Sequence, residues 1–316
     1  MPSSRLSEAL TEGAVAPATA HWPRRSAARW LSRRQGWGLA FAVPALLYLA
    51  VFQLYPILFS LYVSLHDYDL VSPARFVGLR NYLNLARDHA FLNSVAVTVT
   101  YVFYTVVPVL GFAFALAWAL SRLQRSRAFW RTMIFLPSIL PLVSVALIWK
   151  LLLNYRGPVN AALGLVGLPS LPWLTHSAYA PWALVLMSWW HATSYYMIIF
   201  LAGILAIPRQ HYEAAALDGA HGWSLLWYIT LPSMRPTIVL VIVLATVNGL
   251  KTFAFQQIMT DGGPANATQI LTLLIYKTAF NYLQMGRASA YSIVLFAGIL
   301  AISLLQIWLF RSERGA

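Results

Sequence analysis

Long apolar stretches alternate with short polar segments along this chain. Six of the stretches are long enough to cross a bilayer, and they lie near residues 37–64, 93–120, 130–153, 179–206, 236–259 and 289–310. Crossing about 30 Å of hydrocarbon takes roughly 20 helical residues. Unpaired backbone groups exclude other spanning structures except closed barrels, whose strands would alternate in polarity as these stretches do not. The pattern predicts an all-α polytopic membrane protein with six transmembrane helices.

The composition agrees with a membrane solvent. Hydrophobic residues make up 59% of the chain and charged residues 10%, with a mean hydropathy of +0.65, whereas soluble proteins carry about 25% charged residues. The chain has no cysteine, which excludes disulfides, thiolate metal sites and cysteine nucleophiles. Its seven histidines show no metal-ligand spacing such as H-E-x-x-H. We therefore expect no cofactor and no metal in this chain.

The net charge of +13 is better explained by the orientation of the chain in the membrane than by nucleic-acid binding. The basic residues sit between apolar stretches instead of forming a patch, so we expect no nucleic acid among the partners. Segments 1–35, 121–131, 207–235 and 311–316 hold 14 of the 22 Lys and Arg residues, against six in the segments on the opposite side. The positive-inside rule then predicts that both termini are cytoplasmic.

The same pattern divides the chain into four parts. Residues 1–35 form a basic cytoplasmic tail without the apolar region of a signal peptide. Residues 36–92 hold the first transmembrane helix and an external loop, residues 93–310 form the core, and residues 311–316 form a cytoplasmic C-terminus. Prolines inside the spans predict kinks that suit a cavity, or they are simply the prolines common in membrane helices. They are Pro44, Pro56, Pro108, Pro137 and Pro141.

The segment Glu213–Pro236, between the fourth and fifth spans, is long for a plain connection. It opens with three small alanines, Asp218-Gly219 is a turn signal, and Pro232 is expected to stop a short second helix. That helix carries bulky apolar side chains, namely Trp223, Leu226, Trp227 and Ile229. A helix–turn–helix of this kind is typical of a docking surface in which a short helix sits in a partner's groove.

This segment resembles the EAA loop of ABC importer permeases, which reads EAA, two residues, DGA, an apolar stretch ending in LP, and a later P. The matching residues are Glu213, Ala214, Ala215, Asp218, Gly219, Ala220, Leu231, Pro232 and Pro236, while one usually aromatic position is Leu226. Thr260–Phe280 is similar to a segment of carbohydrate permeases, with Asp261 in place of the commoner glycine. Leu54–Leu65 and Phe76–Tyr82 extend the resemblance to roughly residues 37–310, and it points to the maltose, lactose and glycerol-3-phosphate permeases.

The resemblance implies a type I ABC importer permease fold in the cell membrane of a prokaryote. With a second homologous permease subunit, and surrounded by membrane lipid, the chain would form the path for a sugar or sugar-like solute. An extracellular or periplasmic solute-binding protein would deliver that solute. A cytoplasmic ATPase dimer would hold ATP and Mg, because this chain lacks G-x-x-x-x-G-K-[ST] and is not expected to be an enzyme.

In that family the loop near 207–236 couples the permease to the ATPase. The coupling role would fall to Glu213, Ala214, Ala215, Asp218, Gly219, Ala220, Trp223, Leu231 and Pro232. Glu213 would either stabilise the start of the coupling helix against its dipole or hold a basic partner.

Polar side chains within spans are candidates for the solute path, because they are costly unless they face a cavity or each other. Asn248, Lys251 and Thr252 are spaced to share one helical face. Gln256 follows one turn later, and the fourth span adds His191, Ser194, Tyr195 and Tyr196. Sugars favour aromatic faces with convergent polar groups. The alternative for each residue is interhelical packing, and Lys251 either binds an anionic solute or snorkels outward.

Other classes of function fit less well. A secondary transporter needs paired intramembrane carboxylates, and no Asp or Glu lies in any predicted span. A membrane-embedded enzyme needs a metal or nucleophile constellation that is not seen, and a six-helix channel does not need a docking loop. A permease for glycerol-3-phosphate or its diesters remains an alternative within the family. The sequence leaves the solute and the partner subunits open.

Overall fold

The computed structural model describes residues 41–123 and 125–311, so the predicted basic tail over 1–35 lies outside the described residues. The chain forms two compact units, Met1–Leu58 and Phe59–Ala316. The described part of the first unit is a helix from Phe41 that passes through a π-helical turn, η1 (Ala50–Leu54), into the first residues of α2 (Tyr55–Ser64), which continues into the second unit. The rest of the fold belongs to the second unit.

Among residues 41–123 and 125–311, five helices are long and apolar enough to cross a membrane, and a bent pair makes a sixth. The five are Phe41–Ser64, α4 (His89–Arg122), α8 (Ala180–Leu205), α12 with α13 (together Arg235–Met259), and α15 (Met285–Arg311). The bent pair is α5 (Arg127–Ile139) and α6 (Leu142–Leu152). These helices agree with the predicted all-α, multi-spanning fold.

The predicted span over 130–153 is bent into two helices, and the bend lies at one of the prolines for which a kink was predicted. The chain turns by 92° between α5 and α6, and the break falls at Leu140-Pro141, where Leu140 adopts an extended conformation. Proline lacks an N–H and drives the preceding residue out of the helical region. Pro108, in contrast, lies inside α4, which continues for 34 residues without a break.

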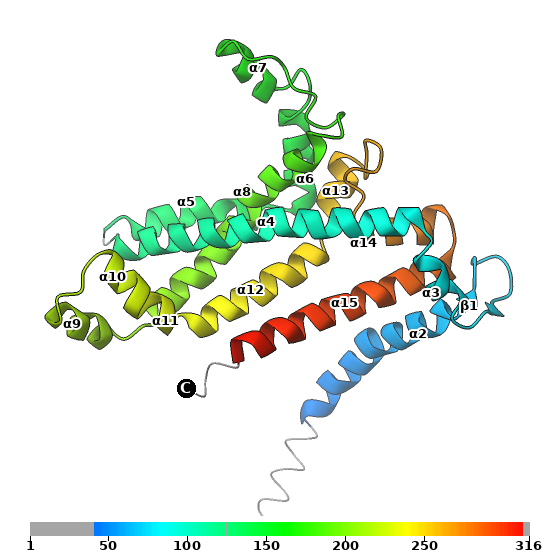
Figure 1. Cartoon of the computed structure of the whole chain (residues 1–316), viewed down its shortest axis with the longest axis horizontal. Helices are drawn as coiled ribbons and strands as arrows, with labels where there is room; N and C mark the ends of the chain where they lie inside the picture. The colour runs from blue at the N-terminus through cyan, green and yellow to red at the C-terminus, as the bar shows by residue number, and fades with distance from the viewer. Residues whose placement is uncertain (1–40, 124, 312–316) are drawn as a thin grey trace, which may run out of the picture. The chain divides into compact units, whose positions relative to one another are not determined.

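The core of the second unit lies between α4, α8 and α12 (Figure 1). Ala113 and Ala117 on α4 are completely buried there, and small side chains let membrane helices approach closely. Gly203 on α8 faces Thr237 on α12 so closely that an added Cβ would lie 2.8 Å from its side chain. α12 also packs against α15.

One end of the second unit holds the short elements. β1 (His66–Asp67) and β2 (Arg75–Phe76) form an antiparallel pair, followed by α3 (Arg80–Leu85). α14 (Leu271–Tyr276) and the π-helical η3 (Lys277–Asn281) precede α15 at this end. In contrast, α7 (Pro158–Leu165), which follows α6, lies apart from them at the top of Figure 1. The Asn81 amide donates to the carbonyls of Ser64 and His66, at 2.8 and 3.0 Å. These bonds fix the β1–β2 loop on α3.

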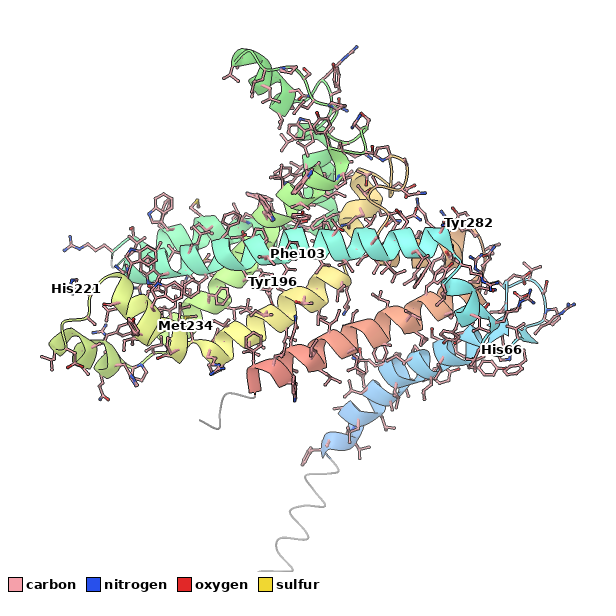
Figure 2. The ribbon with its side chains drawn as sticks, viewed as in Figure 1. His66, Phe103, Tyr196, His221, Met234 and Tyr282 are labelled. Carbon is pink, nitrogen blue, oxygen red and sulfur yellow. The ribbon has the colours of Figure 1, made fainter. Side chains whose placement is uncertain are left out.

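The opposite end holds residues 209–233, which we call the elbow. It consists of α9 (Arg209–Leu217), a turn, α10 (Trp223–Leu225), the π-helical η2 (Leu226–Thr230) and α11 (Leu231–Ser233). α12 (Arg235–Leu250) follows directly. Figure 2 shows His221 and Met234 at the elbow end, His66 and Tyr282 at the other end, and Tyr196 between them.

Two expectations for the elbow are corrected. Pro232 does not stop the second helix, which continues to Ser233, because η2 widens the preceding turn and the Leu231 N–H bonds to the Leu226 carbonyl five residues back. Widening removes the clash between a proline ring and the carbonyl four residues earlier. Glu213 does not lie at the start of its helix, because α9 begins at Arg209, directly after Pro208.

Candidate functional site

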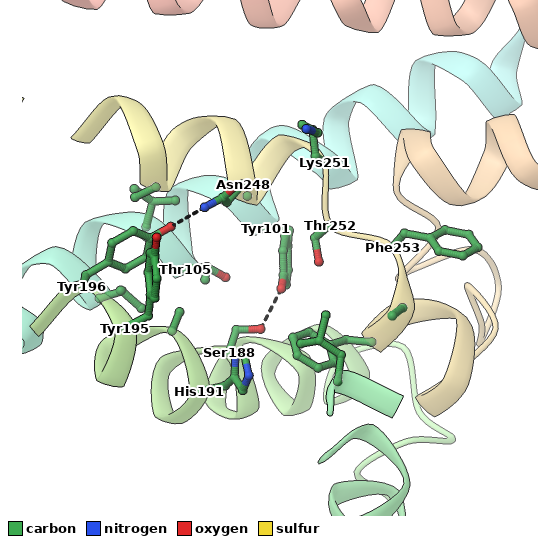
Figure 3. Close-up of a pocket in the computed structure, with 18 residues that line it drawn as sticks. Tyr101, Thr105, Ser188, His191, Tyr195, Tyr196, Asn248, Lys251, Thr252 and Phe253 are labelled. Atoms are coloured by element: carbon green, nitrogen blue, oxygen red, sulfur yellow. Dashed lines mark hydrogen bonds between the residues drawn. The ribbon is translucent and has the colours of Figure 1, made fainter. Parts of the chain in front are cut away.

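A cavity of about 500 Å³ lies between α4, α8, α12 and α13 of the second unit (Figure 3). α13 (Ala254–Met259) follows α12 after a short extended stretch. The polar and aromatic residues of the lining are Tyr101, Thr105, Ser188, His191, Tyr195, Tyr196, Asn248, Lys251, Thr252, Phe253 and Phe255. The cavity therefore combines aromatic faces with convergent hydrogen-bonding groups.

Two hydrogen bonds join the helices around the cavity (Figure 3). The Asn248 amide on α12 donates to the Tyr196 hydroxyl on α8 at 3.2 Å. The Tyr101 hydroxyl on α4 lies 2.7 Å from the Ser188 hydroxyl on α8. Because Ser188 donates to the Leu184 carbonyl at 2.8 Å, Tyr101 is the donor in this pair. The α4 and α12 walls of the cavity are thus tied to α8.

Two polar atoms in the lining are buried without a hydrogen-bond partner in the described part of the chain. They are His191 Nε2 and Thr105 Oγ1. A buried polar atom that lacks a partner costs about 1–3 kcal/mol. Both side chains line the cavity, but these two atoms are covered by protein and would have to turn to reach a solute.

The structure brings most of the predicted solute-path residues together. His191, Tyr195, Tyr196, Asn248, Lys251 and Thr252 all line the cavity. Gln256 does not: it is completely buried on α13 and accepts a 3.4 Å hydrogen bond from Thr252. Ser194 is also buried and donates to the Trp190 carbonyl at 3.2 Å.

The prediction that Asn248, Lys251 and Thr252 share one helical face is wrong, because they do not lie on one continuous helix. α12 ends at Leu250, so Lys251 and Thr252 lie on the stretch between α12 and α13. The Thr272 hydroxyl donates to the Thr252 carbonyl and fixes this stretch. The three side chains reach the same cavity through the bend.

Sequence reasoning missed Tyr101, Thr105 and Ser188. A signal existed: Tyr101 and Thr105 are four residues apart on α4, and Ser188, His191 and Tyr195 follow at three and four on α8. Such spacings place side chains on one face of a helix. Within the lining as the structure describes it, Lys251 is the charged residue, and its side chain is exposed.

The elbow presents an apolar surface to solvent. Its exposed large side chains are Leu217 (90% exposed), Trp223 (67%), Trp227 (62%) and Tyr228 (78%). Ala215 and Leu226 are buried, and the Tyr212 and Thr230 hydroxyls lie 3.2 Å apart across the two arms. Gly219 has φ +81° in the turn between the two arms of the elbow, which are α9 and the segment from α10 to α11. The elbow is thus a structured segment that carries exposed apolar side chains.

Of the other predicted elbow residues, Glu213, Ala214, Asp218 and Pro232 are exposed. Ala220 and Leu231 are partly buried. The exposed set and the four large apolar side chains lie on the same short segment, which follows α8 and precedes α12.

Comparison with known proteins identifies the family. Residues 109–315 match the family described as "Binding-protein-dependent transport system inner membrane component". The chain is 35% identical over 281 residues to the probable ABC transporter permease YesP of Bacillus subtilis, covering 87% of this chain and 90% of YesP. It is 33% identical over 284 residues to the trehalose/maltose permease MalF of Thermococcus litoralis, covering 88% and 94%.

Two further proteins support the assignment. The lactose permease LacF of Rhizobium radiobacter is 32% identical over 284 residues, covering 88% of this chain and 95% of LacF. A chain of the bacterial alginate ABC transporter, solved with an alginate pentasaccharide-bound periplasmic protein, has the same fold: the TM-score is 0.80 at 21% identity, covering 91% of this chain and 98% of that chain. The chain belongs to the family of binding-protein-dependent transport inner membrane components, the permease subunits of ABC importers.

Proposed function

We propose that this permease forms, together with a second homologous permease, the membrane path for a neutral sugar or a short oligosaccharide. The cavity between α4, α8 and α12 is the observation that supports this most directly. Its volume of about 500 Å³ falls within the 300–1,000 Å³ of typical ligand pockets, in which aromatic walls and a few polar groups hold the ligand. The relatives named for trehalose, maltose and lactose support the same solute class.

A glycerol phosphate is the weaker alternative. The phosphate of such a solute is usually bound by several hydrogen-bond donors, such as a bidentate arginine or a helix N-terminus. The described lining offers Lys251 as its charged residue, and that side chain is exposed. The uncharged amide and hydroxyls of the cavity suit a sugar better.

The proposed partners follow from the elbow and from the family. The exposed apolar side chains of the elbow would dock into a groove on a cytoplasmic ATPase dimer, and that dimer would bind ATP and Mg. An external solute-binding protein would deliver the solute, as the alginate transporter solved with its periplasmic protein suggests. Energy would then come from ATP and not from an ion gradient, which distinguishes this function from that of a secondary transporter.

The proposed topology places both termini in the cytoplasm. The end of α4 and the elbow lie together, since the Trp118 and Trp223 rings are 5.6 Å apart. The chain leaves this side at Arg122 and returns to it at the end of α8, so α5 and α6 would have to carry it across the membrane once despite their bend. An even number of crossings supports termini on the same side.

Reconstitution with the partner subunits tests the proposal. Vesicles would carry the permeases and the ATPase with ATP inside, and the binding protein would be added outside. Uptake of radiolabelled maltose, trehalose and lactose would then be measured. We expect uptake of one of these sugars only with ATP, and about tenfold lower uptake for Asn248→Ala, the loss expected when one polar contact is removed from a solute site.

Asn84→Ala, an exposed asparagine on α3, is the matched control and should transport normally. Uptake driven by an ion gradient without ATP would contradict the proposed function. Normal uptake by Asn248→Ala would contradict the cavity as the solute path.

A further inference from the structure

Three side chains connect the end of α4 to the elbow. The Arg122 guanidinium lies 4.0 Å from the centre of the Trp118 ring, and the Trp118 ring lies 5.6 Å from the Trp223 ring on α10. Arg122 Nη2 also donates to the Gly222 carbonyl at 3.5 Å. We call Trp118, Arg122 and Trp223 the clasp. Cation–π and ring contacts of this kind favour one relative position of the two segments.

The helix that carries two clasp residues is held firmly at its end. Arg127, at the start of α5, donates to the carbonyls of Leu120, Ser121 and Leu123, at 3.1, 2.7 and 2.9 Å. Leu120 and Ser121 belong to the last turn of α4 and Leu123 is its C-cap, and a cation at this end also complements the helix dipole. A movement applied at Trp118 and Arg122 would therefore pass into the whole helix instead of unwinding its last turn.

The clasp differs from the other connections of the elbow. α8 continues into the elbow through residues 206–208, and α12 leaves it at Arg235. α4 meets the elbow across 100 residues of sequence, by side-chain contacts. Yet α4 supplies Tyr101, Thr105, Val106 and Val109 to the cavity, and Val109 precedes Trp118 by about 14 Å of helix.

We propose that the clasp makes α4 move together with the elbow, so that movement of the elbow changes the α4 wall of the cavity. This inference rests on the proposed function, because the ATPase would supply the movement. Trp118, Arg122 and Trp223 would then be positioning residues, which act on the solute path through α4. Trp223 is 67% exposed and Arg122 is exposed, whereas Trp118 is partly buried and packs against the core, so Arg122→Ala is the variant that disturbs the core less.

Single cysteines can test this directly, because the chain contains none of its own. Thr105→Cys places a thiol on the α4 wall of the cavity, and Ala192→Cys places one on the α8 wall. Each would be introduced into the complete transporter in membrane vesicles. The labelling rate with a small charged methanethiosulfonate would be compared with and without ATP and vanadate.

With the clasp intact, we expect ATP and vanadate to change the labelling rate at both positions. With Trp118→Ala or Arg122→Ala, the change at Thr105→Cys should shrink by about fivefold or more, as loss of one such contact allows. The change at Ala192→Cys should remain, because α8 is covalently continuous with the elbow. An undiminished change at Thr105→Cys would overturn the proposal, and so would an equal loss at both positions.

Matched variants separate the clasp from general damage. Trp308→Ala, on α15 and 66% exposed, and Arg125→Ala, exposed beside the end of α4, should leave both labelling changes intact. Trp118→Phe keeps a ring under Arg122 and should restore most of the change at Thr105→Cys. If neither thiol responds to ATP when the clasp is intact, the proposed ATP-driven function fails, and the role of the clasp fails with it.

Discussion

Asp88 and Arg287 form an ion pair of 2.8 Å although 199 residues separate them. Asp88 is also the N-cap of α4, where it accepts from the Ala90 and Phe91 N–H groups at 3.0 and 3.4 Å. The Tyr291 hydroxyl donates to the same carboxylate. One side chain thus starts α4 and joins it to the first turns of α15.

This carboxylate predicts a loss of stability in acid. Burial would raise the pKa of Asp88, but hydrogen bonds from Tyr291, the Phe91 N–H and Arg287 outweigh it and hold the pKa below its usual 3.8. A carboxylate whose pKa is lower in the folded than in the unfolded protein contributes its full stabilisation at a pH above the unfolded-state pKa. That stabilisation is lost as the pH falls through the folded-state pKa. We expect the unfolding midpoint of the detergent-solubilised complex, followed by tryptophan fluorescence, to have an Asp88-dependent fall below about pH 4.

Two substitutions separate the cap from the ion pair. Asp88→Ala removes both and should cost about 1–2 kcal/mol at neutral pH. Asp88→Asn keeps a good N-cap without the charge, so it should cost less and remove the acid-dependent part. Equal unfolding midpoints for Asp88→Ala and the unchanged protein would contradict this role.

The start of α15 leaves no room for a side chain at Gly286. A Cβ at this position would lie far inside van der Waals contact with the His66 carbonyl oxygen, and the Gly286 N–H donates to the Tyr68 carbonyl at 3.2 Å. Gly286→Ala should therefore displace the β1–β2 loop and cost about 1–3 kcal/mol in thermal unfolding. Gly298→Ala on the same helix meets nothing within 4 Å and should be neutral or slightly stabilising. Equal effects of the two substitutions would refute the steric argument.

Asp261 adopts a left-handed backbone conformation, and its contacts with Lys277 offset the cost. It has φ +47°, and Lys277 donates to its carbonyl at 2.7 Å and pairs with its carboxylate at 3.0 Å. Asp261→Gly should relieve the left-handed conformation but lose the ion pair between the exposed Asp261 and the largely buried Lys277. The two effects oppose each other, so stability should change by less than about 1 kcal/mol. Asp261→Ala keeps the strain without the pair and should be about 1 kcal/mol less stable than Asp261→Gly. The reverse order in thermal unfolding would disprove this account.

Substitutions at Gly219 should uncouple ATP hydrolysis from sugar uptake. A Cβ there would meet nothing within 4 Å, but φ is +81°, so a substitution strains the turn between the arms without a clash. Gly219→Pro should leave membrane insertion and ATP hydrolysis intact while sugar uptake falls, because the arms would no longer be held in the docking geometry. Glu213→Lys should have the same effect. Gly219→Asn, which tolerates positive φ, is the control and should keep most uptake. Normal uptake by Gly219→Pro would exclude the coupling role.

Hydropathy predicted the spans well, because each crossing must satisfy its own backbone in lipid. It could not decide which prolines break a helix. Pro108 lies within a helix that packs along α8, whereas Pro141 follows Leu140 at the point where α5 gives way to α6. The outcome depends on tertiary packing, which residue order alone does not contain.

The candidate site was predictable in part. Polar residues on the fourth and fifth spans stood out, because they are rare there. Tyr101 and Ser188 did not stand out, since a tyrosine and a serine are common packing residues in membrane helices. Their pairing at 2.7 Å depends on how α4 and α8 face each other, and Gln256 was misjudged because the chain bends after Leu250.

The five-residue π turn before Pro232 determines which single-residue deletions this part of the chain can tolerate. A π turn holds one residue more than the α turn it replaces, so removing a codon within 226–230 would restore an ordinary turn and leave α12 facing the same way. The ring of Pro232 would then press on the carbonyl of the preceding turn. Deletions here should therefore be tolerated only in chains that have also lost the proline.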